Sequence, residues 1–179
     1  INIGGHRKVS MIELKKALEL LGLSDVVTYI NSGNVIFSEN HLSPEVLARN
    51  IEKVIEQSFH FEVPVLIRNV ESISRICEEI PVDWGSDPKK IPQVIFLWNE
   101  IDAEGILDAI TVNTEIEGLH YFPGALVWDM ERETYNKSAV YRFISSAKIT
   151  KQVTVRTLRT VKKLYQMMNE QKWKGYGER

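Results

Sequence analysis

The residues of this chain whose types and spacing could do chemistry lie near the C-terminus, where Thr154, Arg156 and Arg159 stand close together. Arginine carries a planar fork of N–H donors that fits a carboxylate or a phosphate. The apolar spacing after Thr154 predicts a helix over about residues 156–168, with Thr154 as its cap. Exposed cations at a helix N-terminus cost roughly 0.3–1 kcal/mol each, because they meet the positive end of the helix dipole. A bound anion would reverse this cost, so we predict a phosphate or carboxylate site at these three residues.

The same arginines have simpler interpretations, as a solvated basic face or as partners of acidic side chains elsewhere in the chain. Residues 148–174 carry eight Lys/Arg and one acid, whereas residues 1–147 carry thirteen Lys/Arg and twenty-two Asp/Glu. A basic segment of this kind can also bind nucleic acid. The pI of about 6.1 and the lack of an RNP-like aromatic motif favour an anionic small molecule over nucleic acid.

A second set of polar residues is expected at one end of an N-terminal sheet. The segment 31–34 separates two runs rich in β-branched and aromatic residues, which predicts a hairpin. In a β-α-β-β-α-β order this turn, the loop at 2–10 and the loop at 59–62 share one end of the sheet. Backbone N–H groups there could bind an anion or a carbonyl-rich ligand. The residues expected to form this polar rim are Asn2, Gly4, Gly5, Lys8, Asn31, Ser32, Gly33 and Asn34, with His6, Arg7 and His60 beside them.

Turn geometry alone is the alternative explanation for the glycines and asparagines of the rim. The pair Gly4-Gly5 matches neither a P-loop nor a dinucleotide-binding fingerprint. An enzyme that uses Lys8 or His6 as an acid/base group is a further alternative, although no nucleophile–base pair can be identified in the sequence. Whether the protein is an enzyme is therefore left open at this stage.

No metal site or cofactor is expected. The four histidines are scattered without metal-ligand spacing, and the hydrolase, metalloprotease and P-loop motifs do not occur. Cys77 is the only cysteine, so the chain can form no internal disulfide, and it falls on the apolar stripe of a predicted helix. Glu115 and Glu117 are interpreted as solvated charges, and Asp129 as part of a charged surface turn.

The first half of the chain reads as alternating strands and helices. Ser10 and Glu13 form a capping box before a helix at 11–21, and Ser43-Pro44 begins a second helix. Residues 1–3 and 63–67 are expected to be strands, and Asn69 is expected to cap a further helix at about 70–80. This order is that of a ferredoxin-like module with helices on one face of an antiparallel sheet.

The second half repeats that order after a break. Residues 81–92 contain three prolines and a glycine, which indicates a linker or long loop. Strands are expected at 93–98, 115–121 and 125–130, helices after Asp102 and near 135–145, and a short extended piece at 152–155. We therefore predict an α+β protein with two ferredoxin-like modules, at residues 1–80 and 93–179.

The composition fits a globular protein in a reducing, cytoplasmic setting. The 179 residues are 44% hydrophobic and 26% charged, and no apolar run is long enough for a membrane span. No signal peptide is visible at the start of the sequence. Exposed sheet edges could pair two copies of the chain, so we expect either a monomer or a homodimer. We expect no binding to membranes.

Three motifs resemble those of the domain-of-unknown-function family DUF1697. They are the opening Ile1-Asn2-Ile3-Gly4-Gly5 with Lys8, Met11 and Leu14, the hairpin 29–37, and the stretch 154–164 with Arg156, Arg159 and Leu164. The chain has Thr157-Leu158 where the family usually has Asn-Trp, and no clear match to a Ser-Lys pair near 136–138. The resemblance implies a bacterial, cytoplasmic protein of two ferredoxin-like modules, and no established reaction.

Overall fold

The computed structural model describes residues 2–3, 7–38, 41–81 and 84–176. The chain divides into two compact units: residues 1–68 with 166–179 form the first, and residues 69–165 form the second. Helices and antiparallel sheets are mixed in it, so the protein belongs to the α+β class. Within the described ranges, no helix is both long and apolar enough to cross a membrane.

The two helices predicted for the first unit are confirmed, and their caps are the predicted ones. In α1 (Met11–Leu20) the Ser10 side chain accepts from the Glu13 backbone N–H at 3.4 Å. In α2 (Pro44–Phe59) the Ser43 side chain accepts from the Val46 N–H at 3.4 Å. Their apolar stripes form a core cluster with the preceding and following segments: Val9, Leu14, Leu18, Leu23, Val26, Leu47, Ile51 and Ile55.

The strands of the first unit differ from the prediction. β1 (Asn2–Ile3) pairs with β2 (Arg7–Lys8), and β3 (Val27–Tyr29) pairs with β4 (Asn34–Ile36), in two separate two-stranded sheets. The strand predicted at 63–67 is wrong, because this segment is neither helix nor strand. The Glu52 carboxylate of α2 accepts a hydrogen bond from the Val65 N–H at 2.8 Å. A side chain thus bonds a backbone N–H that in a strand would donate to a neighbouring strand.

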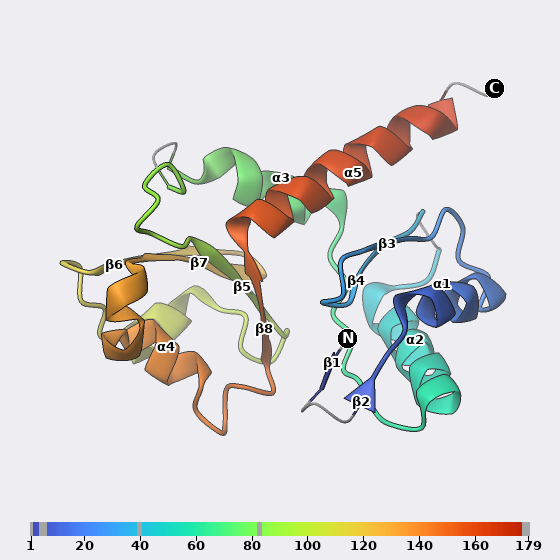
Figure 1. The fold of residues 1–179 in the computed structure, drawn as a ribbon, viewed down its shortest axis with the longest axis horizontal. Coiled ribbons are helices and arrows are strands. Elements are labelled where there is room, and N and C mark those ends of the chain that lie inside the picture. Colours follow the sequence, from blue (N-terminus) through green and yellow to red (C-terminus); the bar gives the residue numbers. More distant parts are fainter. Residues whose placement is uncertain (1, 4–6, 39–40, 82–83, 177–179) are drawn as a thin grey trace. The chain divides into compact units, whose positions relative to one another are not determined.

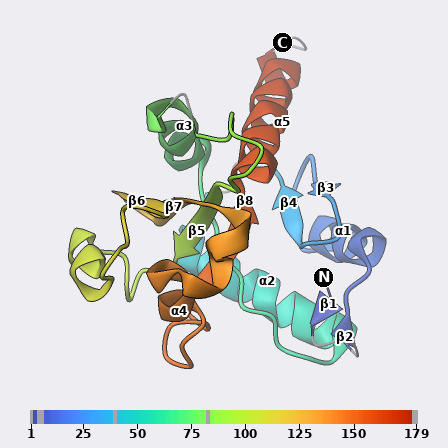
Figure 2. The same cartoon turned by 60° about the vertical axis from the view of Figure 1, so that its left-hand side comes forward.

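The second unit is built on one four-stranded antiparallel sheet. Its strands are β5 (Gln93–Leu97), β6 (Glu117–Phe122), β7 (Ala125–Met130) and β8 (Val153–Thr157), in the order β6-β7-β5-β8. Figure 1 shows α4 (Ala139–Ile144) on one side of this sheet, and α3 (Val70–Glu79) with the start of α5 (Leu158–Tyr176) on the other. The turned view in Figure 2 shows the same division.

Alternate residues of each strand face opposite sides of this sheet. On the α4 side, the core contains Ile95, Leu97, Leu126 and Trp128 packed with Val140 and Ile144, and Val153 and Val155 lie against it. Thr154 and Arg156 of β8 therefore point to the opposite side, the one that α3 and α5 cover. This alternation fixes which side of the sheet each candidate site residue can reach.

Two helices predicted for the second unit differ from the prediction in type or in extent. The helix expected after Asp102 is the 3₁₀ helix η1 (Glu104–Ala109), and Asp102 does not cap it. Its carboxylate instead accepts from the Tyr121 hydroxyl at 3.0 Å and from the Gly124 N–H at 2.9 Å, which attaches it to the β6–β7 turn. The helix expected near 135–145 is divided into η2 (Arg132–Lys137) and α4, because Ser138 begins a new helix there.

The junction of β8 and α5 also corrects the prediction. The helix expected from Arg156, with Thr154 as its cap, is wrong: Arg156 and Thr157 pair with Val94 and Gln93 of β5, and α5 begins at Leu158. Pairing with a central strand has overridden the local helical pattern. The Thr157 hydroxyl caps the helix by accepting from the Thr160 N–H at 3.2 Å.

Candidate functional site

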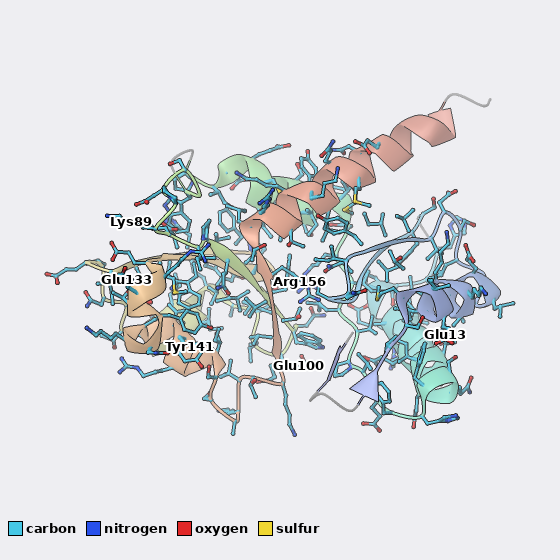
Figure 3. The ribbon with its side chains drawn as sticks, viewed as in Figure 1. Glu13, Lys89, Glu100, Glu133, Tyr141 and Arg156 are labelled. Atoms are coloured by element: carbon cyan, nitrogen blue, oxygen red, sulfur yellow. The ribbon has the colours of Figure 1, made fainter. Side chains whose placement is uncertain are left out.

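Arg156 is the predicted site residue whose position is best defined. Its Nη1 donates to the Thr154 hydroxyl at 2.8 Å and to the Val155 carbonyl at 2.8 Å. The side chain is half-buried, and this burial lowers the pKa of its guanidinium. Figure 3 labels Arg156 on β8. Thr154 and Arg156 are thus brought together on one strand, where the Thr154 hydroxyl and the Val155 carbonyl both accept from the guanidinium.

The first turn of α5 adds to this arrangement. Leu158 donates its N–H to the Pro92 carbonyl at 2.9 Å, and no acidic residue lies in that turn. Arg159 is exposed and forms no ion pair with any residue that the structure describes. We call Thr154, Arg156 and Arg159 the β8–α5 junction. This arrangement differs from the predicted anion site, because Arg156 lies on a strand and only Arg159 lies on a helix.

Charge is separated across the sheet of the second unit. Residues 91–131 contain eight Asp/Glu and no Lys/Arg, whereas residues 134–169 contain eight Lys/Arg and no Asp/Glu. The acidic run includes η1 and the edge strand β6, and the basic run includes the opposite edge strand β8. The summed field of such a distribution attracts anions toward the β8 edge.

The polar rim predicted for the first unit is not one edge of one sheet. Asn2 and Lys8 face each other across β1 and β2, while Asn31, Ser32 and Gly33 form the turn of the β3–β4 hairpin, and these are separate sheets. Gly4, Gly5 and His6 lie outside the described residues. The topology on which the rim was predicted is therefore wrong, and ligand binding by these residues stays a prediction.

The hairpin turn uses its polar groups internally. The buried Asn34 side chain donates to the Tyr29 carbonyl at 3.2 Å and to the Ser32 hydroxyl at 2.8 Å. Gly33 has a φ of +79°, and Ile30 has a φ of +49°, which is a strained value for a β-branched residue. The turn-geometry interpretation accounts for Asn34 and Gly33.

The interpretation of Glu117 as a solvated charge is wrong. Only 4% of Glu117 is exposed, and its carboxylate accepts from the Trp128 Nε1 at 3.1 Å, the Ala139 N–H at 3.0 Å and the Ser138 hydroxyl. These contacts join β6, β7 and the beginning of α4. Alternation along β6 was the available signal, because Glu117 shares its side of the strand with the apolar Leu119 and Tyr121.

The interpretation of Asp129 as part of a surface turn is also wrong. It lies inside β7, and only 2% of it is exposed. Its carboxylate accepts from Lys90 Nζ at 3.1 Å. No sequence pattern pointed to Lys90, because it belongs to the proline-rich segment interpreted as a linker.

Metal and thiol chemistry find no support in the described part of the chain. Among the described residues, no group of three or more His, Cys, Asp or Glu side chains is placed to hold a metal ion. Cys77 is half-buried on α3, and desolvation raises the pKa of its thiol to about 11. The thiol is therefore protonated at neutral pH and is not an activated nucleophile.

Comparison with known proteins agrees with the family suggested by the motifs at 1–14 and 29–37. Residues 1–128 match the family model described as "Protein of unknown function (DUF1697)". The chain belongs to this family. The match ends before β8, so the β8–α5 junction of this DUF1697 protein lies outside the matched residues.

A solved structure extends the likeness over almost the whole chain. The conserved bacterial protein SP0830 from Streptococcus pneumoniae is similar with a TM-score of 0.74 and 25% identity, over 94% of this chain and 93% of that chain. No curated protein matches the sequence. The comparisons therefore give this DUF1697 protein a family and a structural relative, but no reaction or ligand.

Proposed function

We propose that this protein binds an anionic small molecule, such as a phosphorylated metabolite, at the β8–α5 junction. The observation that carries the proposal is the half-buried Arg156 guanidinium, which the Thr154 hydroxyl and the Val155 carbonyl help to hold in place. A positioned and partly desolvated guanidinium binds an anion more strongly than a solvated one, because less entropy and hydration are lost on binding. Exposed Arg159 supplies a second cation three residues further on.

The surroundings of the junction support the same ligand class. The first turn of α5 contains no acid, and its helix dipole adds partial positive charge. The basic run 134–169 reinforces this potential. Arg159 is exposed and forms no ion pair with any described acid, which leaves it available to a ligand in that part of the chain.

The test is a calorimetric titration with phosphate, pyrophosphate, a nucleoside monophosphate and a dicarboxylate. We expect Arg159→Ala to weaken binding by roughly 10- to 100-fold, in line with roughly 1.5–3 kcal/mol for a hydrogen bond to a charged group. Arg156→Lys keeps the charge but loses the fork, and we expect a similar loss.

Arg142→Ala is the matched control, since Arg142 is an exposed arginine of the same basic run but lies on α4, across the sheet from the junction. Absence of binding by every anion would contradict the proposal. So would equal binding by the wild type and by Arg159→Ala.

Nucleic-acid binding is the second candidate, and the 36 residues without an acid at 134–169 favour it. It predicts binding of a single-stranded oligonucleotide that weakens steeply with salt, and weakens further as Arg159, Lys162 and Lys163 are removed one by one. A small-anion site instead predicts that one phosphate group binds nearly as well as a long chain of them.

We also propose that the second unit is a ferredoxin-like module, in which η1 replaces the first helix. Its support is the chain order β5-η1-β6-β7-α4-β8 with an entirely antiparallel sheet. The module at 1–80 and the boundary at 81–92 stay predictions, because the described strands of the first unit form two separate sheets and the chain divides after residue 68. A bacterial, cytoplasmic setting belongs to the same proposal. The bacterial origin of the relative from Streptococcus pneumoniae supports the bacterial part of this proposal.

A further inference from the structure

A buried carboxylate in the second unit has one oxygen without a partner. Asp129 is 2% exposed, its Oδ2 accepts from Lys90 Nζ at 3.1 Å, and its Oδ1 accepts no hydrogen bond from any described residue. A buried acceptor left without a donor costs roughly 1–3 kcal/mol, and more when it is charged. Such an atom in a native protein calls for a donor from a ligand or an ordered water.

The lysine beside it is held firmly and still reaches solvent. The segment of Lys90 is attached to β7 by hydrogen bonds from Ile91 N to Met130 O, at 2.9 Å, and from Arg132 N to Lys89 O, at 3.0 Å. The Lys90 side chain is 37% exposed. One N–H of its ammonium is used by Asp129, so the others can donate to an acceptor on a bound molecule.

An aromatic pair lies next to this carboxylate. Gly118 is paired with Asp129 across β6 and β7, and the six-membered ring of Trp84 covers it so closely that a Cβ on Gly118 would lie 2.9 Å from Trp84 Cζ2. His120, two residues along β6, meets Trp84 edge-on with ring centroids 5.0 Å apart. Trp84 is half-buried and His120 is exposed, so both residues keep some surface in contact with solvent.

We propose that Asp129, Lys90 and Trp84 form a binding site for a planar ring that carries an N–H donor beside a carbonyl oxygen, as guanine and uracil do. The ring N–H would donate to Asp129 Oδ1, the carbonyl would accept from Lys90 Nζ, and the ring would stack on Trp84. Because Oδ1 is covered, binding requires the Trp84 or Lys90 side chain to rotate toward solvent.

The chemistry of the three groups selects this class over others. A metal ion is disfavoured, since the Lys90 ammonium lies 3.1 Å from the same carboxylate and would repel it. An anion with no donor satisfies Lys90 but leaves Oδ1 unpaired. A ring with adjacent donor and acceptor satisfies both groups, and an indole is a stacking partner for a flat heterocycle.

The test is a titration of the intact chain with guanosine, uridine and 1-methylguanosine, followed by calorimetry. We expect guanosine and uridine to bind and 1-methylguanosine to bind at least about 10-fold more weakly, because its methyl group removes the donor to Oδ1. Asp129→Asn should weaken guanosine binding by a similar factor and leave 1-methylguanosine unchanged.

Two further variants keep the proposal testable if Asp129→Asn does not fold. Lys90→Gln removes the partly exposed donor and should weaken both nucleosides, and Trp84→Leu should do the same by removing the stacking surface. Glu100→Gln is the matched control, because Glu100 is an exposed acid of the same acidic run, labelled apart from this region in Figure 3.

Several results would overturn the proposal. One is the absence of guanosine and uridine binding at millimolar concentration. Another is equal binding of guanosine and 1-methylguanosine by the wild-type chain. A crystal structure with an ordered water on Asp129 Oδ1 that also bonds two other protein groups would likewise remove the need for a ligand. The site is distinct from the β8–α5 junction, so loss of phosphate binding in Arg159→Ala does not bear on it.

Discussion

Two buried carboxylates of the second unit, Glu117 on β6 and Asp129 on β7, have opposite hydrogen-bond environments. Glu117 accepts from an indole, a hydroxyl and two backbone N–H groups, whereas Asp129 accepts from one lysine and has an oxygen without a partner among the described residues. Their exposures are nearly the same, at 4% and 2%. Burial alone therefore does not distinguish a structural carboxylate from a candidate binding group.

The difference lies in which elements supply the donors. The donors to Glu117 come from β7, from the beginning of α4 and, at 3.4 Å, from the Asn113 N–H in the preceding loop, so that carboxylate joins β6 to several elements of the unit. The donor to Asp129 comes from Lys90, on an irregular segment, through a side chain that reaches solvent. A fully bonded buried carboxylate is expected to stabilise the fold, and a partly bonded one is expected to do so less.

The largest effect is expected for Glu117→Gln. The new amide keeps the shape but places two donors where Trp128, Ser138 and Ala139 already donate, so at least one buried donor loses its acceptor. We expect a loss of about 2–4 kcal/mol in the free energy of unfolding. Urea unfolding followed by near-UV circular dichroism measures it, since Trp128 is buried against this carboxylate.

Glu115→Gln is the control for that change, because Glu115 is an exposed acid two residues away, and surface substitutions usually stay within about 0.5 kcal/mol. Ser138→Ala should also destabilise the unit, and its effect should not add to that of Glu117→Gln, since both remove the same hydrogen bond. If Glu117→Gln lowers the free energy of unfolding by less than about 1 kcal/mol, the contrast between a structural Glu117 and a partly bonded Asp129 is wrong.

A smaller effect is expected for Gly118→Ala, which tests the aromatic cover beside Asp129. The added Cβ would meet Trp84 Cζ2 at 2.9 Å, so the ring must move. We expect a loss of about 1 kcal/mol or more, as for other overpacked sites. In a Trp84→Leu background the same change should cost less.

Gly105→Ala is the matched control, because nothing lies within 4 Å of a Cβ at that position, and we expect almost no change in stability. Equal effects of the two glycine substitutions would mean that Trp84 moves freely. That result would also remove the fixed aromatic surface from the Asp129 site.

Local patterns predicted the elements whose signals are short-range. The caps at Ser10, Ser43 and Asn69 and the hairpin around Asn31–Asn34 were read from neighbouring residues, and the structure confirms them. The start of α5 was missed because the pairing of Arg156 with Val94 depends on residues some sixty positions apart. Tertiary pairing of this kind overrides local propensity.

For the candidate site, too, the sequence predicted local features but not the long-range pairing that positions them. The basic charge of Arg156 and Arg159 was visible in the sequence, but the strand that holds Arg156 beside Thr154 was not. The contact between Lys90 and Asp129 spans 39 positions and joins two segments that sequence reasoning assigned to a linker and a surface turn. The continuous apolar run of β7 was an available signal, since a charged residue inside an otherwise apolar strand implies a buried charge.

The smallest effect is expected from the ion pair of Lys90, and pH can isolate it. The hydrogen bond to Asp129 is the main cause that raises the pKa of Lys90, and Asp129, Asp87 and Glu131 add favourable charge interactions. Because the folded pKa lies above the usual 10.5, this stabilisation is complete below pH 10.5 and is lost as the pH rises through the folded value. Lys90 is partly exposed, so we expect the contribution to stay below about 1 kcal/mol.

Other groups titrate in the same alkaline range, so the measurement must be a difference. For Cys77, Tyr121 and Tyr135 the main cause of a raised pKa is burial. Loss of their protons therefore destabilises the fold at high pH as well. Unfolding free energies of the wild type and of Lys90→Met, measured from about pH 9 to about pH 12, should therefore converge above pH 10.5, because only the wild type loses the ion pair. A constant difference across that range would show that Lys90 acts by packing alone, and Asp129 would then be a buried charge that no ion pair stabilises, which would widen its contrast with Glu117.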